Sequence, residues 1–335
     1  VTVHSKGWYM MTGEIIAAVG AGRMGRGMAV AFAYAGHSVH LIDAKQRSDP
    51  DYQQLAAEAL DEVHKTLTTM ASFGMLLVEE VNDVAARVTV NSLNDCSSAL
   101  STSNVIFEGV PERLDAKQQA FALICDHASA DAIIASTTST ILSNDLQGFV
   151  STPSRFLNAH WLNPAYLVPL VELSPSEKTD PAVTHKLKIL LERIGKVPVI
   201  CAASPGYIVP RIQALAMNEA ARMVEEGVAS AEDIDKATKY GFGFRFAVLG
   251  LLEFIDWGGG DILYYASQYM TKATGSDRFA APEIIEDNMA KGHTGLRDGQ
   301  GFLDYDKLDV PTYQRERLAA FVAMLHHLDK MPFKG

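Results

Sequence analysis

A histidine and a glutamate in the stretch HWLNPAYLVPLVEL, residues 160–173, are the first candidates for chemistry in this sequence. Glu172 lies in an apolar run, between Val171 and Leu173. Burying a carboxylate is unfavourable unless a partner or hydrogen bonds compensate for its lost hydration. Glu172 therefore either faces water or has a dedicated partner, and His160 is the candidate for that partner.

A glycine-rich turn, GAGRMG at residues 20–25, is the second candidate. The residue pattern predicts a short buried strand over 14–20 before it and a helix over 24–36 after it. Such a motif is weak evidence alone, but between a strand and a helix it is typical of a dinucleotide-binding unit. The alternative is a glycine-rich turn in an ordinary βαβ unit.

Each glycine of this turn has its own task in a dinucleotide-binding unit. Gly20 permits the tight turn, Gly22 lets a pyrophosphate approach the backbone, and Gly25 lets the helix pack closely on the strand. The free N–H groups at the start of the helix then bind the phosphates. We expect the whole turn, Arg23 and Met24 included, to contact the cofactor.

An aspartate at the end of the second predicted strand, 38–43, indicates which dinucleotide is bound. Asp43 lies eighteen residues after Gly25. A carboxylate there accepts hydrogen bonds from the adenine ribose and repels the extra phosphate of NADP, which favours NAD. Lys45 and Arg47 follow closely and keep NADP open as an alternative.

Strand and helix patterns alternate up to about residue 202, and only helix patterns follow. The sequence therefore predicts an α/β fold: a Rossmann-type dinucleotide-binding domain over 11–202 and an all-α domain over 203–335. His160 ends a predicted strand, and ligands of open α/β sheets bind beyond the carboxyl ends of the strands. In the helical part, Ser230 is a predicted N-cap. Its abundant apolar residues would pack within the chain or across a homodimer.

Composition excludes several other classes of protein. The chain has 335 residues, 48% of them hydrophobic, which is enough to bury a large core. A net charge of −11 without a basic block argues against nucleic-acid and membrane partners. Three cysteines without CxxC spacing indicate neither a disulfide framework nor a metal site, and favour the cytoplasm. No apolar run can span a bilayer, and residues 1–10 are expected to lie outside the fold, before a start at Met10 or Met11.

Six segments together resemble one enzyme family. In order, they are GAGRMG, EGVPERLDAK, ASTTST, HWLNPAYLVPLVEL, PGYIVPRI and GQGFLDY. At these separations they resemble the 3-hydroxyacyl-CoA dehydrogenases, from residue 14 to about 305. The resemblance implies oxidation of the 3-hydroxyl of a short L-3-hydroxyacyl substrate to the 3-oxo product, with NAD taking the hydride.

The resemblance also implies roles for individual residues. His160 would be the general base, and Glu172 would orient it and stabilise the imidazolium that forms. Ser139 would donate a hydrogen bond to the substrate oxygen, although by chemistry alone it is as well explained as a turn hydroxyl. Asn163 would fix the loop beside His160 or contact the nicotinamide end of NAD.

Glu112 and Lys117 match positions that contact the cofactor in the family, whereas in isolation they suggest a solvated helix start. The chain departs from the family pattern at Pro210, where an asparagine is usual, so an amide that helps to hold substrate is missing. Arg245 resembles the branch that includes lambda-crystallin and the L-gulonate and carnitine dehydrogenases, which act on small free acids. An arginine suits a carboxylate, and a surface or dimer salt bridge is the alternative.

The substrate could therefore be a 3-hydroxybutyryl-CoA-like thioester or a free 3-hydroxy acid. Residues 49–84 contain only Lys65 among many acids, which disfavours CoA, a polyanion. A catalytically silent, lambda-crystallin-like NAD-binding protein is a second hypothesis, suggested by Pro210. A β-hydroxyacid dehydrogenase with a catalytic lysine is a third, and no lysine lies between Ala203 and Asp235 to support it.

Overall fold

The computed structural model describes residues 13–332, and the segment 1–10 expected to lie outside the fold is not among them. The chain divides into two compact units, the first ending at Ala216 and the second beginning at Met217. The predicted domain boundary at 202/203 stays a prediction. Within residues 13–332, no helix combines the length and the apolar character that a membrane span requires.

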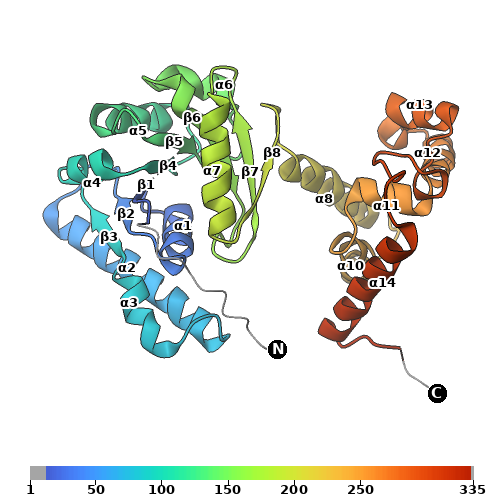
Figure 1. Ribbon diagram of the computed structural model, residues 1–335, viewed down its shortest axis with the longest axis horizontal. Coiled ribbons are helices and arrows are strands. Elements are labelled where there is room, and N and C mark those ends of the chain that lie inside the picture. The colour runs from blue at the N-terminus through green and yellow to red at the C-terminus, as the bar shows by residue number, and fades with distance from the viewer. Residues whose placement is uncertain (1–12, 333–335) are drawn as a thin grey trace. The chain divides into compact units, whose positions relative to one another are not determined.

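Strands and helices alternate along the first unit (Figure 1). Its strands are β1 (Ile16–Val19), β2 (Val39–Ile42), β3 (Val88–Asn91), β4 (Val105–Glu108), β5 (Ile133–Ser136), β6 (Phe156–Trp161), β7 (Leu170–Pro175) and β8 (Val197–Ile200). Its helices are α1 (Arg23–Tyr34), α2 (Asp49–Ser72), α3 (Val81–Ala85), α4 (Cys96–Thr102), α5 (Leu114–His127), α6 (Ser143–Leu146) and α7 (Pro181–Arg193). Short 3-10 turns are η1 (Val78–Glu80), η2 (Gln147–Phe149) and η3 (Pro153–Arg155).

The eight strands form one sheet in the order β3-β2-β1-β4-β5-β6-β7-β8. All neighbouring strands are parallel except β6 and β7, which are antiparallel. The first strand, β1, lies inside the sheet, and the strands that follow it are added on both sides, which is the arrangement of a doubly wound dinucleotide-binding fold. The predicted Rossmann-type domain is confirmed.

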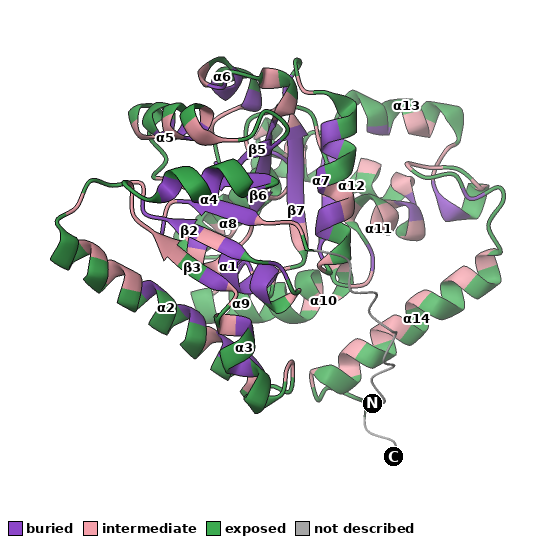
Figure 2. Ribbon diagram, turned by 60° about the vertical axis from the view of Figure 1, so that its left-hand side comes forward, coloured by how far each residue is buried: buried purple, intermediate pink, exposed green. Residues whose placement is uncertain are grey.

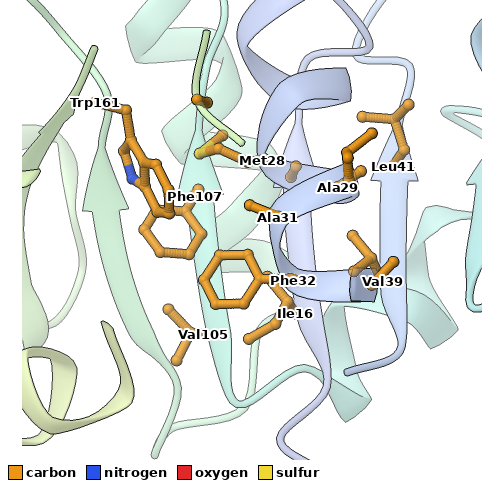
Figure 3. Packing of buried hydrophobic residues seen from close by; sticks show 14 of the residues in the cluster. Ile16, Met28, Ala29, Ala31, Phe32, Val39, Leu41, Val105, Phe107 and Trp161 are labelled. Carbon is orange, nitrogen blue, oxygen red and sulfur yellow. The ribbon is translucent and has the colours of Figure 1, made fainter. Parts of the chain in front are cut away.

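Helices cover both faces of the sheet, and the strands β1, β4, β5 and β6 are buried along their whole length (Figure 2). On one face, Phe32 of α1 packs against Phe107 of β4 and Trp161 of β6, with ring centroids 5.6 and 5.8 Å apart (Figure 3). On the other face, Phe121 of α5 packs edge-on against Phe156 of β6. Burial of these large side chains supplies the main driving force that holds the helices on the sheet.

The described part of the second unit contains helices and no strand. The helices are α8 (Val209–Glu225), which starts in the first unit, α9 (Ala231–Ala237), a π-helical turn η4 (Thr238–Gly243), α10 (Phe244–Phe246), α11 (Leu251–Gly258), α12 (Gly260–Thr274), η5 (Asp277–Phe279), α13 (Glu283–Lys291), η6 (Leu296–Asp298) and α14 (Val310–His327). Ser230 caps α9 as predicted, since its hydroxyl accepts the Asp233 N–H at 3.1 Å. The all-α character of the C-terminal part is confirmed.

Candidate functional site

His160 and Glu172 lie directly opposite each other in the antiparallel pair β6 and β7. The ring nitrogen Nδ1 of His160 is 2.8 Å from Oε2 of Glu172. Both residues are buried, with 4% of His160 and none of Glu172 exposed. Neighbouring positions of β6, Ala159 and Trp161, point to the opposite face and into the core. Glu172 therefore does not face water, and His160 is its partner.

The second carboxylate oxygen of Glu172 is also occupied. Oε1 accepts the backbone N–H groups of Ile208 and Val209 at 2.9 and 2.8 Å, where α8 begins. Burial raises the pKa of the Glu172 carboxyl, but the hydrogen bonds from His160 and these two N–H groups outweigh burial and lower it. The carboxylate is thus held ionised, with one oxygen aimed at the imidazole.

Pro210 follows these two N–H groups in the first turn of α8. A helix leaves its first N–H groups without partners inside the helix, so a proline in the first turn loses no helical hydrogen bond. The departure from the family pattern is therefore compatible with the local backbone.

Glu112 holds the loop that follows β5. Its Oε1 accepts the backbone N–H groups of Ser139 and Thr140 at 3.0 and 2.9 Å, and the hydroxyls of Thr138 and Thr140. Burial opposes ionisation of this carboxyl, but these hydrogen bonds and the ammonium of Lys117 prevail and lower its pKa to about 2. Ser139 itself is exposed at the turn of this loop.

Lys117 lies in the core of the same network. Its Nζ is 3.0 Å from each carboxylate oxygen of Glu108 and 3.3 Å from Glu112. Glu108 also accepts the Ser136 hydroxyl at 2.5 Å and the Val110 N–H at 2.9 Å. The Lys117 side chain is 1% exposed, so here it joins α5, β4 and the loop after β5. Its predicted contact with the cofactor stays a prediction, as does that of Glu112.

The glycine turn has the geometry that a dinucleotide requires. Gly20 adopts a φ of +118°, and a Cβ there would lie 2.6 Å from the carbonyl oxygen of Gly109. A Cβ on Gly25 would lie 2.1 Å from the Gly20 carbonyl oxygen. Gly22 faces open space and caps α1, whose first turn includes Arg23 and Met24 and carries no acidic residue. The start of α1 is therefore open to a phosphate group.

A cavity of about 940 Å³ extends from this turn to Asp43 and the start of α5. Asp43 is 4% exposed, and the guanidinium Nε of Arg47 lies 2.5 Å from its Oδ2. Lys45 donates its backbone N–H to the same carboxylate at 3.4 Å. The residues present fit the adenosine and pyrophosphate of NAD: a glycine turn at one end and a carboxylate at the other.

Asn163 is exposed in the loop after β6 and lines a smaller cavity of about 230 Å³. Arg23, Arg26 and Tyr166 line the same cavity, and Arg26 is paired with Glu62 at 2.5 Å. This cavity places Asn163 beside residues from the start of α1.

Arg245 belongs to the second unit, where it is exposed. Its Nε donates to the Gly241 carbonyl at 3.1 Å, and its guanidinium lies 5.2 Å from the centre of the Phe254 ring. The predicted contact of Arg245 with substrate stays a prediction.

Sequence reasoning missed four residues of these sites: Glu108, Asn158, Tyr207 and Arg47 as the partner of Asp43. Glu108 carried a signal, because a glutamate at the end of a buried strand needs a partner and Lys117 follows nine residues later. Asn158 also carried a signal, since it lies two residues before His160 and therefore on the same face of the predicted strand. Tyr207 carried none, because it reaches His160 only through a contact between distant segments.

Several known proteins are similar to this chain in sequence and in architecture. The sequence model of the NAD binding domain of the 3-hydroxyacyl-CoA dehydrogenase family matches residues 15–204. The sequence model of the C-terminal domain of the same family matches residues 206–305. The chain is 30% identical to a 5-formyl-3-hydroxy-2-methylpyridine 4-carboxylate 5-dehydrogenase of Mesorhizobium japonicum, over 94% of this chain and 98% of the relative. It is 33% identical to the lambda-crystallin homolog of Bos taurus, over 76% and 77%. A crystal structure of a 3-hydroxyacyl-CoA dehydrogenase from Archaeoglobus fulgidus matches with a TM-score of 0.74 and 29% identity, over 95% of this chain and 100% of that one.

Proposed function

This chain belongs to the 3-hydroxyacyl-CoA dehydrogenase family, and we propose that it oxidises the 3-hydroxyl of a short L-3-hydroxyacyl substrate with His160 as the base. The protein is an NAD-dependent oxidoreductase that acts on CH–OH groups. The observation that carries the proposal is the buried pair of His160 and Glu172, joined at 2.8 Å at the carboxyl end of β6.

His160 takes the proton of the substrate hydroxyl on Nε2, the ring nitrogen opposite the one that faces Glu172. Among residues 13–332, no group is hydrogen-bonded to Nε2. Glu172 keeps the other proton on Nδ1 and stabilises the imidazolium as it forms, which is the role of a carboxylate beside a catalytic histidine. NAD would supply the acceptor for the hydride that leaves the hydroxyl-bearing carbon of the substrate, and the glycine turn and Asp43 would hold it.

Ser139 donates a hydrogen bond to the substrate oxygen, whose negative charge grows as the proton leaves. Glu112 fixes the backbone on which Ser139 lies, through the N–H groups of Ser139 and Thr140. Asn163 holds the loop after β6 or contacts the nicotinamide end of the cofactor. His160 and Ser139 thus both contact the substrate oxygen, His160 as the base and Ser139 as the hydrogen-bond donor.

Substitution of His160 tests the assignment of the base. His160→Ala should abolish NADH formation and leave the affinity for NAD unchanged, while His185→Ala, an exposed histidine of α7, should change neither. Retained turnover in His160→Ala would overturn the proposal. NAD binding by the wild-type protein without turnover of any 3-hydroxy substrate would favour a silent, lambda-crystallin-like role.

The substrate itself is a short 3-hydroxyacyl-CoA or a free 3-hydroxy acid. The free acid is supported by Arg245, by the shortage of lysines in residues 49–84, and by a relative named for a pyridine carboxylate. The thioester is supported by relatives named 3-hydroxyadipyl-CoA dehydrogenase and probable 3-hydroxyacyl-CoA dehydrogenase.

Turnover of L-3-hydroxybutyryl-CoA should be compared with a panel of free 3-hydroxy acids, for wild type, Arg245→Ala and Arg315→Ala. Arg315 is an exposed arginine of the same unit and serves as the control. Turnover of a free acid that only Arg245→Ala removes would establish the carboxylate contact. Turnover of the thioester, unchanged by Arg245→Ala, would contradict it and indicate a role in fatty acid metabolism.

We also propose a homodimer in the cytoplasm. Within the described chain, α8 and α14 bury none of their residues, and α8 exposes 66% of Leu215 and 69% of Met217. Apolar faces of this kind are typical of subunit interfaces. Light scattering after size-exclusion chromatography should give twice the chain mass of 36.4 kDa, and a monomer would contradict the proposal. Cell fractionation tests the location.

A further inference from the structure

The aromatic ring of Tyr207 lies flat against the imidazole of His160. The ring centroids are 5.0 Å apart and the planes differ by 2°. Tyr207 is 5% exposed and immediately precedes the two N–H groups that hold Glu172. The same short segment therefore contacts both members of the buried pair.

The hydroxyl of Tyr207 reaches the loop that carries Ser139. It donates to the Thr138 carbonyl oxygen at 2.9 Å and accepts a hydrogen bond from Nδ2 of Asn158 at 3.0 Å. Burial raises the pKa of this hydroxyl, so it stays protonated and remains a donor. Asn158 lies two residues before His160 on the same face of β6.

The backbone of Tyr207 is in an unusual conformation. Its φ is +45°, a region that residues other than glycine rarely adopt. Such a conformation persists when the surrounding contacts determine it, and it is concentrated at functional sites. In Tyr207 the ring, the hydroxyl and the two following N–H groups all have partners, and these partners belong to the candidate catalytic groups or their neighbours.

We propose that Tyr207 is a positioning residue that aligns His160 with Ser139. The hydrogen bond to Glu172 fixes one nitrogen of the imidazole but lets the ring rock about that bond. Contact with the flat face of Tyr207 removes this freedom, and the hydroxyl fixes the Thr138 peptide next to Ser139. Nε2 of His160 and the Ser139 hydroxyl are then directed at one substrate oxygen. The inference rests on the proposed function, because His160 and Ser139 are its reacting groups.

The ring and the hydroxyl are tested separately with Tyr207→Phe and Tyr207→Leu. Tyr207→Phe should lower kcat about fivefold to tenfold, the effect of losing the hydrogen bond to the Thr138 carbonyl, while Nδ2 of Asn158 keeps its hydrogen bond to the Ile141 carbonyl. Tyr207→Leu should lower kcat about a hundredfold, because the alignment of the base is lost as well. KM for the hydroxy substrate and the affinity for NAD should stay within about twofold of wild type in both. Tyr34→Phe is the matched control, since it also removes a hydroxyl that donates to a carbonyl, that of Met75 at 2.7 Å.

A double-mutant cycle with Ser139→Ala separates positioning from general stabilisation. If the hydroxyl of Tyr207 acts through the loop of Ser139, Tyr207→Phe should lower kcat in the wild-type background and have little effect in Ser139→Ala. Equal effects in both backgrounds would overturn the proposal. If Tyr207→Leu fails to fold, the double-mutant cycle of Tyr207→Phe with Ser139→Ala decides the question.

Failure of this inference can be told apart from failure of the proposed function. Turnover in His160→Ala would refute the proposed function itself. An inactive His160→Ala together with wild-type kcat in Tyr207→Phe and Tyr207→Leu would refute only the positioning role of Tyr207.

Discussion

Glu172→Gln should inactivate the enzyme without unfolding it. The side chain keeps its shape, and its carbonyl oxygen can still accept the N–H groups of Ile208 and Val209. The amide nitrogen then faces Nδ1 of His160 at the position where a carboxylate oxygen lies 2.8 Å away. Because an amide N–H donates, Nδ1 must accept, and the proton of a neutral imidazole moves to Nε2. That is the nitrogen that has to take the substrate proton.

The size of the effect has two contributions: the lost hydrogen bond to a charged group and the change of imidazole tautomer. A hydrogen bond to a charged group contributes about 1.5–3 kcal/mol, which is roughly a tenfold to 150-fold change in rate. The wrong tautomer adds to this loss, and the corresponding amide substitution in a serine protease triad lowers kcat about ten-thousandfold. We therefore expect kcat of Glu172→Gln to fall between about a hundredfold and ten-thousandfold.

NADH absorbance under saturating NAD measures this effect directly. The affinity for NAD and the thermal unfolding midpoint show whether the fold is intact. Glu192→Gln, an exposed glutamate of α7 paired with Lys188, is the control and should retain full activity. A Glu172→Gln enzyme with more than about a tenth of wild-type kcat would refute the role of the pair, because the lost charged hydrogen bond alone predicts a larger effect.

Three further predictions concern the cofactor cavity and the loop network. Asp43→Ala should weaken NAD binding about tenfold to a hundredfold, because the carboxylate that accepts the ribose hydroxyls is lost. It should also reduce the preference for NAD over NADP, because Arg47 loses its carboxylate partner. Isothermal titration with both dinucleotides measures both effects. Lys117→Met should lower the free energy of unfolding by about 3–5 kcal/mol, because Glu108 stays buried without its counter-charge; urea melts measure this. Adding Glu108→Gln to the same chain should restore part of the lost stability. Because the pKa of Glu112 is lowered from 4.5 to about 2, its ionised carboxylate stabilises the fold fully at pH values above 4.5. This contribution is lost as the pH falls from 4.5 toward about 2. The difference in unfolding free energy between wild type and Glu112→Gln should therefore close over that range. A constant gap in acid melts would contradict this assignment.

Local sequence patterns were sufficient to predict one feature in each unit. The turn at 20–25 was predictable because glycine is required where φ is positive or where a Cβ would meet backbone, as at Gly20 and Gly25. The Ser230 cap was predictable because the hydroxyl and the N–H that it binds are three residues apart. Both features depend on neighbouring residues alone.

Glu112 and Lys117 show where this reasoning reaches its limit. The sequence suggested a solvated helix start or, by resemblance, contacts with the cofactor. In the structure Glu112 binds a loop 27 residues away and Lys117 is buried against Glu108. The side chains have the same charges in every case, and only the packing of α5 against β4 and β5 decides which partners they meet.

The sequence by itself determined the dinucleotide turn, the alternation of strands and helices, and the presence of a glutamate in an apolar run that needed a partner. Tertiary structure decided that the partner is His160, because the antiparallel register of β6 and β7 sets residues 160 and 172 opposite each other. It also decided that Tyr207 lies on the imidazole. Such contacts join segments 12 and 47 residues apart, and they exist only once the sheet and the start of α8 have packed together.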